Sequence, residues 1–316
     1  MVVEAREINK ARTAFIGSIS NHSHQARIHA EIHQMRSDQG GTVTGRFSYS
    51  NPNLQQIPAR NAILGPLIRS IFVPEQDCEW GIFDYSQQEP RLVVHYAALQ
   101  EFSGASKFLD AYQEDDTTDF HQLVADIANI PRKQAKTINL GLFYGMGKGK
   151  LMSQLGLNLE DAEDILATYH GRVPFVKQLM KDTMYKAGKK GYLRTLLGRR
   201  CRFDLWEPTN EWGSKALPLK QAEDEYGEHM IKRAWTYKAL NRLIQGSAAD
   251  QTKKAMLELS KEGYIAHIQV HDELDFSISS KKDQERIKEI METSVELLVP
   301  SKVDIEIGKS WGDAGK

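Results

Sequence analysis

The stretch YIAHIQVHDELDFSI, residues 264–278, alternates apolar and polar residues on both sides of a central His-Asp-Glu. Because alternation with a period of two is typical of β-strands, the stretch predicts a β-hairpin with Asp272 and Glu273 at its turn. A second strand is predicted for EWGIFDYS, residues 79–86, a short apolar run with Asp84 near its end. The two segments therefore place acidic side chains at strand ends that lie far apart in the sequence.

These carboxylates have two interpretations. If they lie together they repel, and each raises the other's pKa unless a cation lies between them. Magnesium prefers oxygen ligands and leaves positions open for substrate phosphates, and two such ions about 3.5–4 Å apart promote in-line phosphoryl displacement. Alternatively, Asp84 caps a helix and the His-Asp-Glu turn is simply solvated, since isolated acids at strand ends are common. Spacing alone does not decide between the two.

Helical patterns fill most of the chain between the strand segments. A last strand is predicted for VDIEIG near the C-terminus, and the Gly-, Asn-, Ser- and Pro-rich residues 37–66 predict a long ordered loop or a set of turns. Strands early and late around a helical insertion favour an α+β fold. The predicted helical segments are 1–35, 86–101, most of 102–235 with breaks at 145–149, 188–191 and 198–218, then 236–262 and 281–298.

Two predicted helix starts bear on chemistry. Ser86 and Glu89 match a capping box, although Pro90 moves the predicted start a residue or two later. In RKQAKTINLGLFYG, residues 132–145, Arg132 and Lys136 lie one turn apart in the positive N-terminal half of a predicted helix. The side chains could hold a triphosphate through charge-assisted hydrogen bonds, or they could be two solvated bases on a surface helix.

Composition excludes several classes of protein. The chain has 316 residues with 41 Lys and Arg against 42 Asp and Glu, so its net charge of −1 gives no global attraction to nucleic acid or anionic lipid. Its two cysteines, Cys78 and Cys201, cannot build a disulfide framework or a thiolate metal site, which suits a reducing compartment. The charged N-terminus lacks the apolar core of a signal peptide, and no apolar run approaches the ~18 residues needed to span a membrane. A cytoplasmic location is predicted.

Five segments, in order, resemble the signature segments of family A DNA polymerases, the family of bacterial DNA polymerase I, and their wording is closest to phage members. The resemblance extends from about residue 27 to the C-terminus. If the origin is a phage, the predicted location is the host cytoplasm. The segments are TVTGRFSYSNPNLQQIPAR (42–60), DYSQQEPR (84–91), RKQAKTINLGLFYG (132–145), NRLIQGSAAD (241–250) and QVHDELDF (269–276).

The resemblance implies a right-hand architecture, with a palm built on an antiparallel sheet and helical fingers inserted in it. It implies a thumb remnant and lead-in at 1–40, palm at 41–96, fingers at 97–235 and the second part of the palm at 236–316. Only about 40 residues precede TVTGR, so most of the thumb is expected to be missing. A missing N-terminal part, or a partner polypeptide that supplies the thumb and an exonuclease domain, is therefore expected.

The resemblance also assigns roles to residues. Asp84 and Asp272 look like the carboxylates that bind two Mg²⁺ ions, with the Tyr85 carbonyl on a metal and Glu273 as the supporting acid. Lys136 looks like the group that protonates the pyrophosphate leaving group. The positions that resemble nucleotide-binding residues are Gln87, Glu89, His121, Arg132, Lys136, Leu140 and Tyr144. The positions that resemble residues along the primer–template duplex are Arg46, Asn53, Gln55, Arg60, Asn241, Gln245 and His271.

The implied reaction is template-directed transfer of a nucleotide from a dNTP to a primer 3′-hydroxyl. Glu89 would exclude a 2′-hydroxyl by occupying its space, and Tyr144 would lie at the template-base slot. Minor-groove contacts would test base-pair geometry without reading sequence, because the acceptors there are nearly the same for every correct pair. Leu140 and Tyr237 depart from the family, which most often has Phe or Tyr at the first position and, in bacterial members, Arg at the second.

Two alternative functions and the interpretation of one basic segment stay open. A single-subunit RNA polymerase shares the palm, but Glu89 and the PNLQQIP segment argue against it. A non-catalytic DNA-binding module could keep this shape, but the joint presence of Asp84, Asp272, Arg132 and Lys136 argues against loss of catalysis. The basic segment GRRCR, residues 198–202, predicts either a solvated turn or a contact with the DNA backbone.

Overall fold

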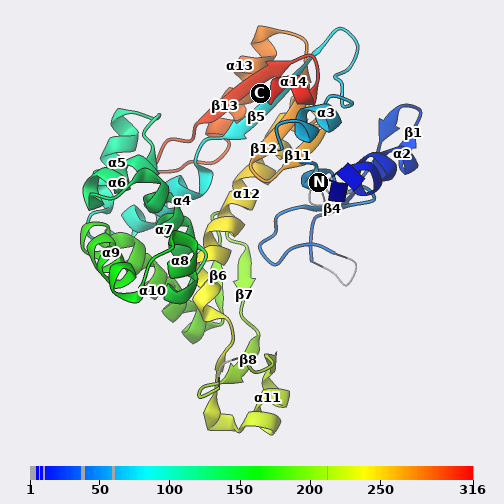
Figure 1. Cartoon of the computed structure of the whole chain (residues 1–316). Helices are drawn as coiled ribbons and strands as arrows, with labels where there is room; N and C mark the ends of the chain where they lie inside the picture. The colour runs from blue at the N-terminus through cyan, green and yellow to red at the C-terminus, as the bar shows by residue number, and fades with distance from the viewer. Residues whose placement is uncertain are drawn as a thin grey trace. The chain divides into compact units, whose positions relative to one another are not determined.

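The computed structural model describes residues 5–6, 8–9, 11–36, 40–58, 61–211 and 213–315 (Figure 1). Contacts between residues divide the chain into two compact units. The first, the sheet unit, comprises Met1–Ser86, Gln251–Glu296 and Ser301–Lys316. The second, the helical unit, comprises Gln87–Asp250 and Leu297–Pro300. The sheet unit is therefore assembled from both ends of the chain, as the sequence predicted. These units do not delimit palm and fingers, so the four predicted domain boundaries remain predictions.

The sheet unit contains a four-stranded antiparallel sheet in the order β11-β12-β5-β13 (Figure 1). The strands are β11 (Ile268–Val270), β12 (Glu273–Ile278), β5 (Glu79–Tyr85) and β13 (Val303–Gly308). The predicted hairpin is confirmed, with His271 and Asp272 as its two-residue loop. His271 adopts a φ of 58°, the left-handed conformation that tight hairpin loops require.

Alternation along the strands gives the sheet two different faces. On one face Phe83, Leu274 and Phe276 pack against α13 (Lys281–Thr293) and the C-terminal part of α12 (Ala239–Lys261). Phe83 is completely buried, so truncating it to Ala should cost about 3–5 kcal/mol. On the other face Trp80 and Ile82 pack against smaller elements. These are η2 (Leu54–Gln56), α3 (Leu64–Arg69) and α14 (Trp311–Ala314).

The N-terminal prediction was only partly right. Within the described ranges, the π-helix η1 (Ala11–Gly17) and α2 (Ser18–Asn21) are helical. The chain then forms three strands, and the turn between the first two contains Gln25 and Ala26, which have φ values of 49° and 59°. Tertiary pairing overrides local helical pattern here, because β3 pairs with a strand from the following loop. The strands are β1 (Ser23–His24), β2 (Arg27–Ile28), β3 (Glu31–His33) and its partner β4 (Ser48–Ser50).

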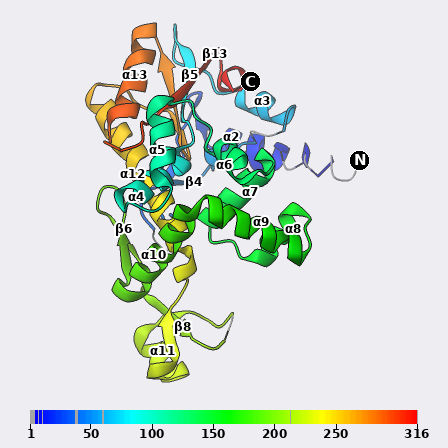
Figure 2. The same ribbon diagram turned by 90° about the vertical axis from the view of Figure 1, so that its left-hand side faces the viewer.

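The helical unit is a set of helices around one apolar core, in which Leu92, Phe120, Ile138 and Phe175 are fully buried (Figure 2). Helix α6 packs against α7 and α9. The helices are α4 (Gln88–Leu99), α5 (Ala105–Glu114), α6 (Phe120–Ala128), α7 (Arg132–Phe143), α8 (Lys148–Leu155), α9 (Leu159–Arg172), α10 (Pro174–Lys190) and the first part of α12.

After α10 the mainly helical prediction for 102–235 was only partly right. The break at 198–218 and the helix α11 were predicted, but β6 and β10 are strands in segments that were predicted to be helical. Two strands, β6 (Tyr192–Arg194) and β7 (Arg200–Arg202), form a hairpin. A three-stranded sheet follows in the order β10-β8-β9. Strands this short carry little alternation, so the pattern does not distinguish them from turns. The remaining elements are β8 (Leu205–Pro208), β9 (Leu217–Pro218), α11 (Leu219–Tyr226), η3 (Glu228–Met230), β10 (Ile231–Arg233) and η4 (Thr236–Lys238).

The two helix starts differ in how well the sequence predicted them. The capping box at Ser86 was wrong, because α4 begins at Gln88 and its N-cap is Gln87, which has left-handed geometry and no side-chain cap bond. Helix α7 begins at Arg132, one residue from the predicted start, and ends at Phe143. Gly145 follows with a φ of 70°, and a Cβ there would lie 2.5 Å from the carbonyl oxygen of Tyr237. This close approach explains why glycine ends the segment.

Candidate active site

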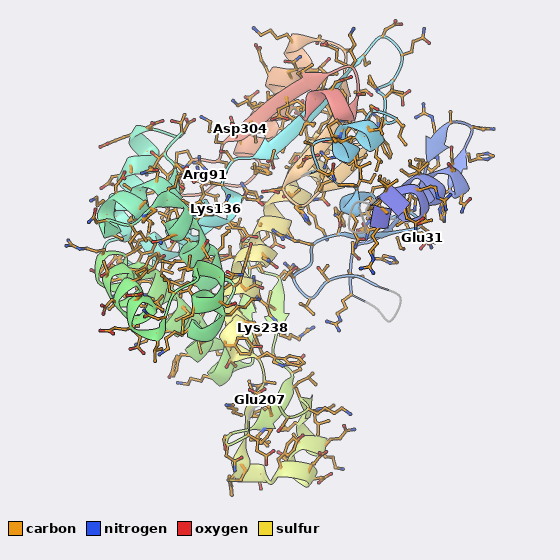
Figure 3. All side chains as sticks on the ribbon, in the orientation of Figure 1. Glu31, Arg91, Lys136, Glu207, Lys238 and Asp304 are labelled. Carbon is orange, nitrogen blue, oxygen red and sulfur yellow. The ribbon has the colours of Figure 1, made fainter. Side chains whose placement is uncertain are left out.

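A row of carboxylates crosses the sheet. Glu273 on β12 and Asp304 on β13 both pair with Asp84 on β5, so the three side chains project from the same face. The backbone N–H of Tyr85 donates to the carbonyl of Asp272 at 3.3 Å, which ties the hairpin loop to the end of β5. The structure thus brings together the predicted Asp84, Asp272 and Glu273. It adds Asp304, shown on β13 in Figure 3.

The electrostatics of this row favour a bound cation. Burial, and then the negative charges of Asp272, Glu273 and Asp304, raise the pKa of Asp84 to about 8. Burial also raises the pKa of Asp272, against the charge of Arg46, which lowers it. The Oδ1 atom of Asp84 is buried with no hydrogen-bond partner. A buried carboxyl group without a partner is costly to ionise, so a cation at this row would stabilise its charged form.

Behind the row lies a buried acid that the sequence interpretation did not single out. Asp275 is fully buried, and burial followed by the charge of Glu273 raises its pKa well above the usual range. The indole Nε1 of Trp311 donates to Glu273 at 3.2 Å, and the Arg69 guanidinium lies 4.2 Å from the Trp311 ring centre. The Trp311 indole, which packs against Arg69, therefore restrains the Glu273 carboxylate through a hydrogen bond. Alternation in QVHDELDF could have placed Asp275 on the face of Glu273.

The hairpin loop is supported by a chain of amides. Gln55 donates to the side chain of Gln269 at 3.1 Å, and Gln269 in turn donates to the carbonyl of His271 at 2.5 Å. Gln55 and His271, both predicted to line the duplex, are thus connected through the buried Gln269. Asn53, another predicted duplex residue, caps η2 by accepting from the Gln55 N–H at 3.2 Å. Arg60 lies outside the described residues.

The fit of a metal depends on donor chemistry. Across the described parts of the chain, no group of three or more His, Cys, Asp or Glu side chains is arranged to hold a metal ion. The predicted ligands are different in kind, since they are two carboxylates, Asp84 and Asp272, and the backbone carbonyl of Tyr85. Hard oxygen donors of this type suit Mg²⁺, which keeps several waters and few protein ligands. The unpartnered Oδ1 of Asp84 and its raised pKa fit such an ion.

In the helical unit, α7 carries the predicted cationic face. Arg132 and Lys136 are exposed on α7, Leu140 is half-buried and Tyr144, at the C-cap, is exposed. The predicted helix with two exposed cations one turn apart is therefore confirmed (Figure 3 labels Lys136). Arg132 donates from Nε to Asp119 at 2.9 Å. Asp119 also caps α6 by accepting from the N–H of His121. The cap therefore holds Arg132 at the start of α7, a link that the sequence did not predict.

Two other predicted nucleotide contacts are already engaged within the unit. The Tyr144 hydroxyl donates to Glu89 at 3.0 Å, which couples the predicted template-slot residue to the predicted ribose gate. The Gln87 amide donates to the Thr118 carbonyl at 3.0 Å and accepts from the Phe120 N–H at 2.8 Å. These bonds order the segment that leads into α6. The contact of Gln87 with a triphosphate stays a prediction.

His121 is buried near the start of α6. Burial, opposed by Asp119 and reinforced by Lys136 and Arg132, lowers its pKa to about 4. Its Nδ1 lies 2.9 Å from the side-chain nitrogen of Asn139. The two remaining predicted duplex residues, Asn241 and Gln245, are half-buried one turn apart on α12. The contacts of all three with substrate stay predictions.

The antiparallel sheet of the first unit and the helices of the second give the chain an α+β fold. The sequence pattern of the family described as DNA polymerase family A matches residues 1–313. The chain therefore belongs to DNA polymerase family A, as its signature segments predicted. Among the described residues, no helix is long and apolar enough to cross a membrane.

Relatives and solved structures agree with this assignment. A DNA-directed DNA polymerase of Pseudomonas phage M6 is 38% identical over 99% of this chain and 51% of its own length. DNA polymerase I of Geobacillus stearothermophilus is 34% identical over 99% of this chain and 34% of its own length. The POL domain of Pol1 from M. smegmatis, solved in complex with DNA primer-template and dNTP, has a TM-score of 0.78 and 29% identity. The match includes 98% of this chain and 53% of the M. smegmatis chain. The chain thus spans about half the length of the phage relative.

Proposed function

We propose that this chain is the catalytic core of a template-directed DNA polymerase. In the proposed reaction the primer 3′-oxygen forms a bond to the α-phosphorus of a dNTP, and the bond from that phosphorus to the bridging oxygen breaks to release pyrophosphate. The observation that carries the proposal is the carboxylate row, in which Asp84 has a buried oxygen without a partner and a pKa raised to about 8. Family membership supports the same reaction class.

The proposed metal site consists of Asp84, Asp272 and the Tyr85 carbonyl, with Glu273 beside it. Two Mg²⁺ ions bound there would neutralise the developing charge on the attacking and leaving oxygens. The protein's own contribution is to hold the acids in place. Pairing of β5 with β12 and β13 and the Trp311 hydrogen bond to Glu273 limit their movement before substrate arrives.

The proposed nucleotide site lies on α7 and α6. Arg132 and Lys136 would bind the triphosphate, and Lys136 would protonate the pyrophosphate as it leaves. Glu89, held by Tyr144, would exclude the 2′-hydroxyl of a ribonucleotide. Leu140 would pack against the incoming sugar and base. The proposed duplex contacts, through the minor groove and backbone, are Arg46, Asn53, Gln55, Arg60, Asn241, Gln245 and His271.

Primer extension with Mg²⁺ tests this function. Asp272→Ala should reduce the extension rate by at least about 10²-fold, the scale seen when one preorganised electrostatic group is removed from an active site. Asp283→Ala provides a matched control, because Asp283 is an acid of the same unit whose side chain accepts hydrogen bonds from Ser279 and Ser280 at the start of α13. Equal extension by wild type and Asp272→Ala would contradict the metal assignment. Faster incorporation of rNTPs than dNTPs by wild type would favour the RNA polymerase alternative.

The sequence led us to expect either a missing N-terminal part or a partner polypeptide that grips the duplex, and both alternatives remain predictions. Their test is processivity. Extension of a long template in single binding events at physiological salt, by this chain alone, would contradict both. Distributive extension that becomes processive on addition of a partner would support the partner polypeptide.

A further inference from the structure

A chain of buried polar side chains leads to His121. The Tyr169 hydroxyl on α9 lies 2.6 Å from the amide oxygen of Asn139 on α7. The amide nitrogen of Asn139 lies 2.9 Å from Nδ1 of His121 on α6. Tyr169 and Asn139 are fully buried, and His121 keeps an exposed fraction of 6%. The three helices lie side by side in Figure 2, and α6 packs against both of the others. Neither Asn139 nor Tyr169 has a role in the proposed function.

The amide has two possible orientations, and the hydroxyl decides between them. If the Asn139 oxygen faces Tyr169, it accepts the hydroxyl proton, and the amide nitrogen donates to Nδ1 of His121. If the amide is turned over, its nitrogen donates to the tyrosine oxygen, and the hydroxyl proton needs another acceptor. Among the described residues, the structure gives the Tyr169 hydroxyl no second partner. A buried polar hydrogen without an acceptor is costly, so the first orientation is favoured.

The first orientation determines the state of the imidazole. A neutral imidazole has one protonated and one bare nitrogen. Because Nδ1 accepts from Asn139, the proton of the neutral ring lies on Nε2. The charged and titratable groups around the ring are Asp119 at the α6 N-cap, Arg132 and Lys136 on α7, and Tyr169 on α9. Burial, reinforced by the two cations, outweighs Asp119 and keeps the ring neutral, with its pKa lowered to about 4.

We propose that Asn139 and Tyr169 are positioning residues that hold His121 neutral, with its proton on Nε2, as a hydrogen-bond donor to the triphosphate. The triphosphate as ligand rests on the proposed function, whereas the tautomer of His121 follows from the hydrogen bonds alone. A donor without charge binds a phosphate oxygen and adds no third cation to Arg132 and Lys136. The His121 imidazole stays neutral at any pH well above the one at which it takes up a second proton, so its hydrogen bond to the phosphate is available throughout the neutral pH range.

The tautomer is measured directly by NMR of the protein with ¹⁵N-labelled histidine, with the His121 signals assigned by their loss in His121→Gln. In wild type the proton is expected on Nε2. Asn139→Asp keeps an acceptor for the Tyr169 hydroxyl but places a carboxylate oxygen against Nδ1. A proton should therefore appear on Nδ1, and the His121 pKa should rise. Wild type with its proton on Nδ1, or Asn139→Asp with an unchanged His121, would overturn the proposal.

Tyr169→Phe tests the first link and covers the case in which Asn139→Asp does not fold. Without the hydroxyl, nothing selects one amide orientation, so both His121 tautomers should be observed. Tyr96→Phe is the matched control, because it removes the hydroxyl of a half-buried tyrosine of the same unit that bonds to Ser247 at 2.7 Å. Its His121 spectrum should equal wild type. A single Nε2-protonated form in Tyr169→Phe would show that the hydroxyl plays no part.

Kinetics distinguish positioning from general damage. Because only the Nε2-protonated fraction of His121 can donate, the dNTP KM in Tyr169→Phe should rise by the inverse of that fraction, roughly twofold for equal tautomer populations, with kcat and primer–template affinity nearly unchanged. Tyr96→Phe should leave KM unchanged. An equal fall of kcat in both variants would contradict a role in nucleotide binding. If wild type shows no extension at all, the proposed function fails, while the NMR result still decides the tautomer.

Discussion

Glu89 and Tyr144 are the residues whose predicted roles the structure links most directly. One lies in the first turn of α4 and the other at the C-cap of α7, and a 3.0 Å hydrogen bond joins them. The bond fixes the carboxylate of Glu89 at a defined place. A side chain that excludes a hydroxyl by its volume has to be held in this way, because a mobile one would move aside.

Selection against ribonucleotides is therefore expected to depend on both residues. Glu89→Ala should raise the ratio of rNTP to dNTP incorporation by at least about tenfold, equivalent to ~1.4 kcal/mol of discrimination. Tyr144→Phe should raise it less, because the carboxylate remains and loses only its hydrogen bond to Tyr144. Single-nucleotide incorporation kinetics measure the ratio. Glu114→Ala, which removes an exposed acid from α5, is the control, and an unchanged ratio in Glu89→Ala would disprove the gate.

The residues that sequence reasoning missed share one property, which is that each acts through a neighbour from a distant segment. Asp304 matters because β13 pairs with β5, and Gln269 because it reaches both Gln55 and His271. Asn139 lies in the quoted α7 segment, yet its partners are on α6 and α9. Spacing along one element cannot identify such partners.

At the scale of elements, the β6–β7 hairpin resolves part of the ambiguity of GRRCR. Arg199 pairs with Asp250 at 3.0 Å and donates to the Gly246 carbonyl at 2.9 Å, so it is a structural residue of the helical unit. Arg200, also in this segment, lies instead on the exposed face of the hairpin, opposite Arg194 on the neighbouring strand. Both arginines are exposed beside Tyr192. Cys201 and Leu193 are on the buried face.

If this exposed face contacts the DNA backbone, its charge should appear in the salt dependence of binding. Reversal of Arg194 and Arg200 to Glu should weaken primer–template binding and reduce the slope of log K against log salt by roughly 2. Fluorescence anisotropy over a range of salt concentrations measures the slope. Lys281→Glu with Lys282→Glu, on exposed positions of α13, is the charge-matched control. Equal slopes for the two double variants would leave the hairpin as a solvated turn.

The junction after α7 depends on a second element. Because Gly145 has a φ of 70° and a Cβ there would lie 2.5 Å from the Tyr237 carbonyl, Gly145→Ala should lower the free energy of unfolding by about 2–3 kcal/mol. Gly147→Ala should cost about 1 kcal/mol or less, because nothing lies within 4 Å of its Cβ position. Urea unfolding followed by tryptophan fluorescence compares the two. Similar losses would show that the contact with Tyr237 is not rigid.

At the scale of the whole molecule, a buried neutral histidine makes stability depend on pH. The pKa of His121 is lowered to about 4 in the folded protein, below the ordinary value near 6.5 of the unfolded chain. Between these values the unfolded state binds more protons, so stability is fully present above about pH 6.5 and is lost as the pH falls toward 4. The shift corresponds to about 2–3 kcal/mol at pH 4.5.

His121→Gln should abolish that part of the pH dependence. Urea midpoints at pH 7 and pH 4.5 should differ less in the variant than in wild type, by an amount equivalent to about 2–3 kcal/mol. His24→Gln is the control, because His24 is exposed. Carboxylates titrate in the same range in all three proteins, so only the difference between them is diagnostic. An identical pH dependence in wild type and His121→Gln would mean that His121 is protonated at little cost.

The sequence by itself determined the periodic and ordered features of this protein. The hairpin at 264–278, the strand ending near Asp84, the helix with Arg132 and Lys136 on one face, and the α+β class all depend on local periodicity or on the order of segments along the chain. Such features are encoded in neighbouring residues, because strands repeat every two residues and helices every 3.6.

Only the tertiary structure decided which distant groups meet and in what state. Strand β3 of the N-terminal region pairs with β4 from the following loop, and the row from Glu273 to Asp304 exists because three strands align in one register. The raised pKa of Asp84 and the lowered pKa of His121 arise from burial and from charges on other segments. Burial and proximity are properties of the folded chain, and for that reason no local pattern contains them.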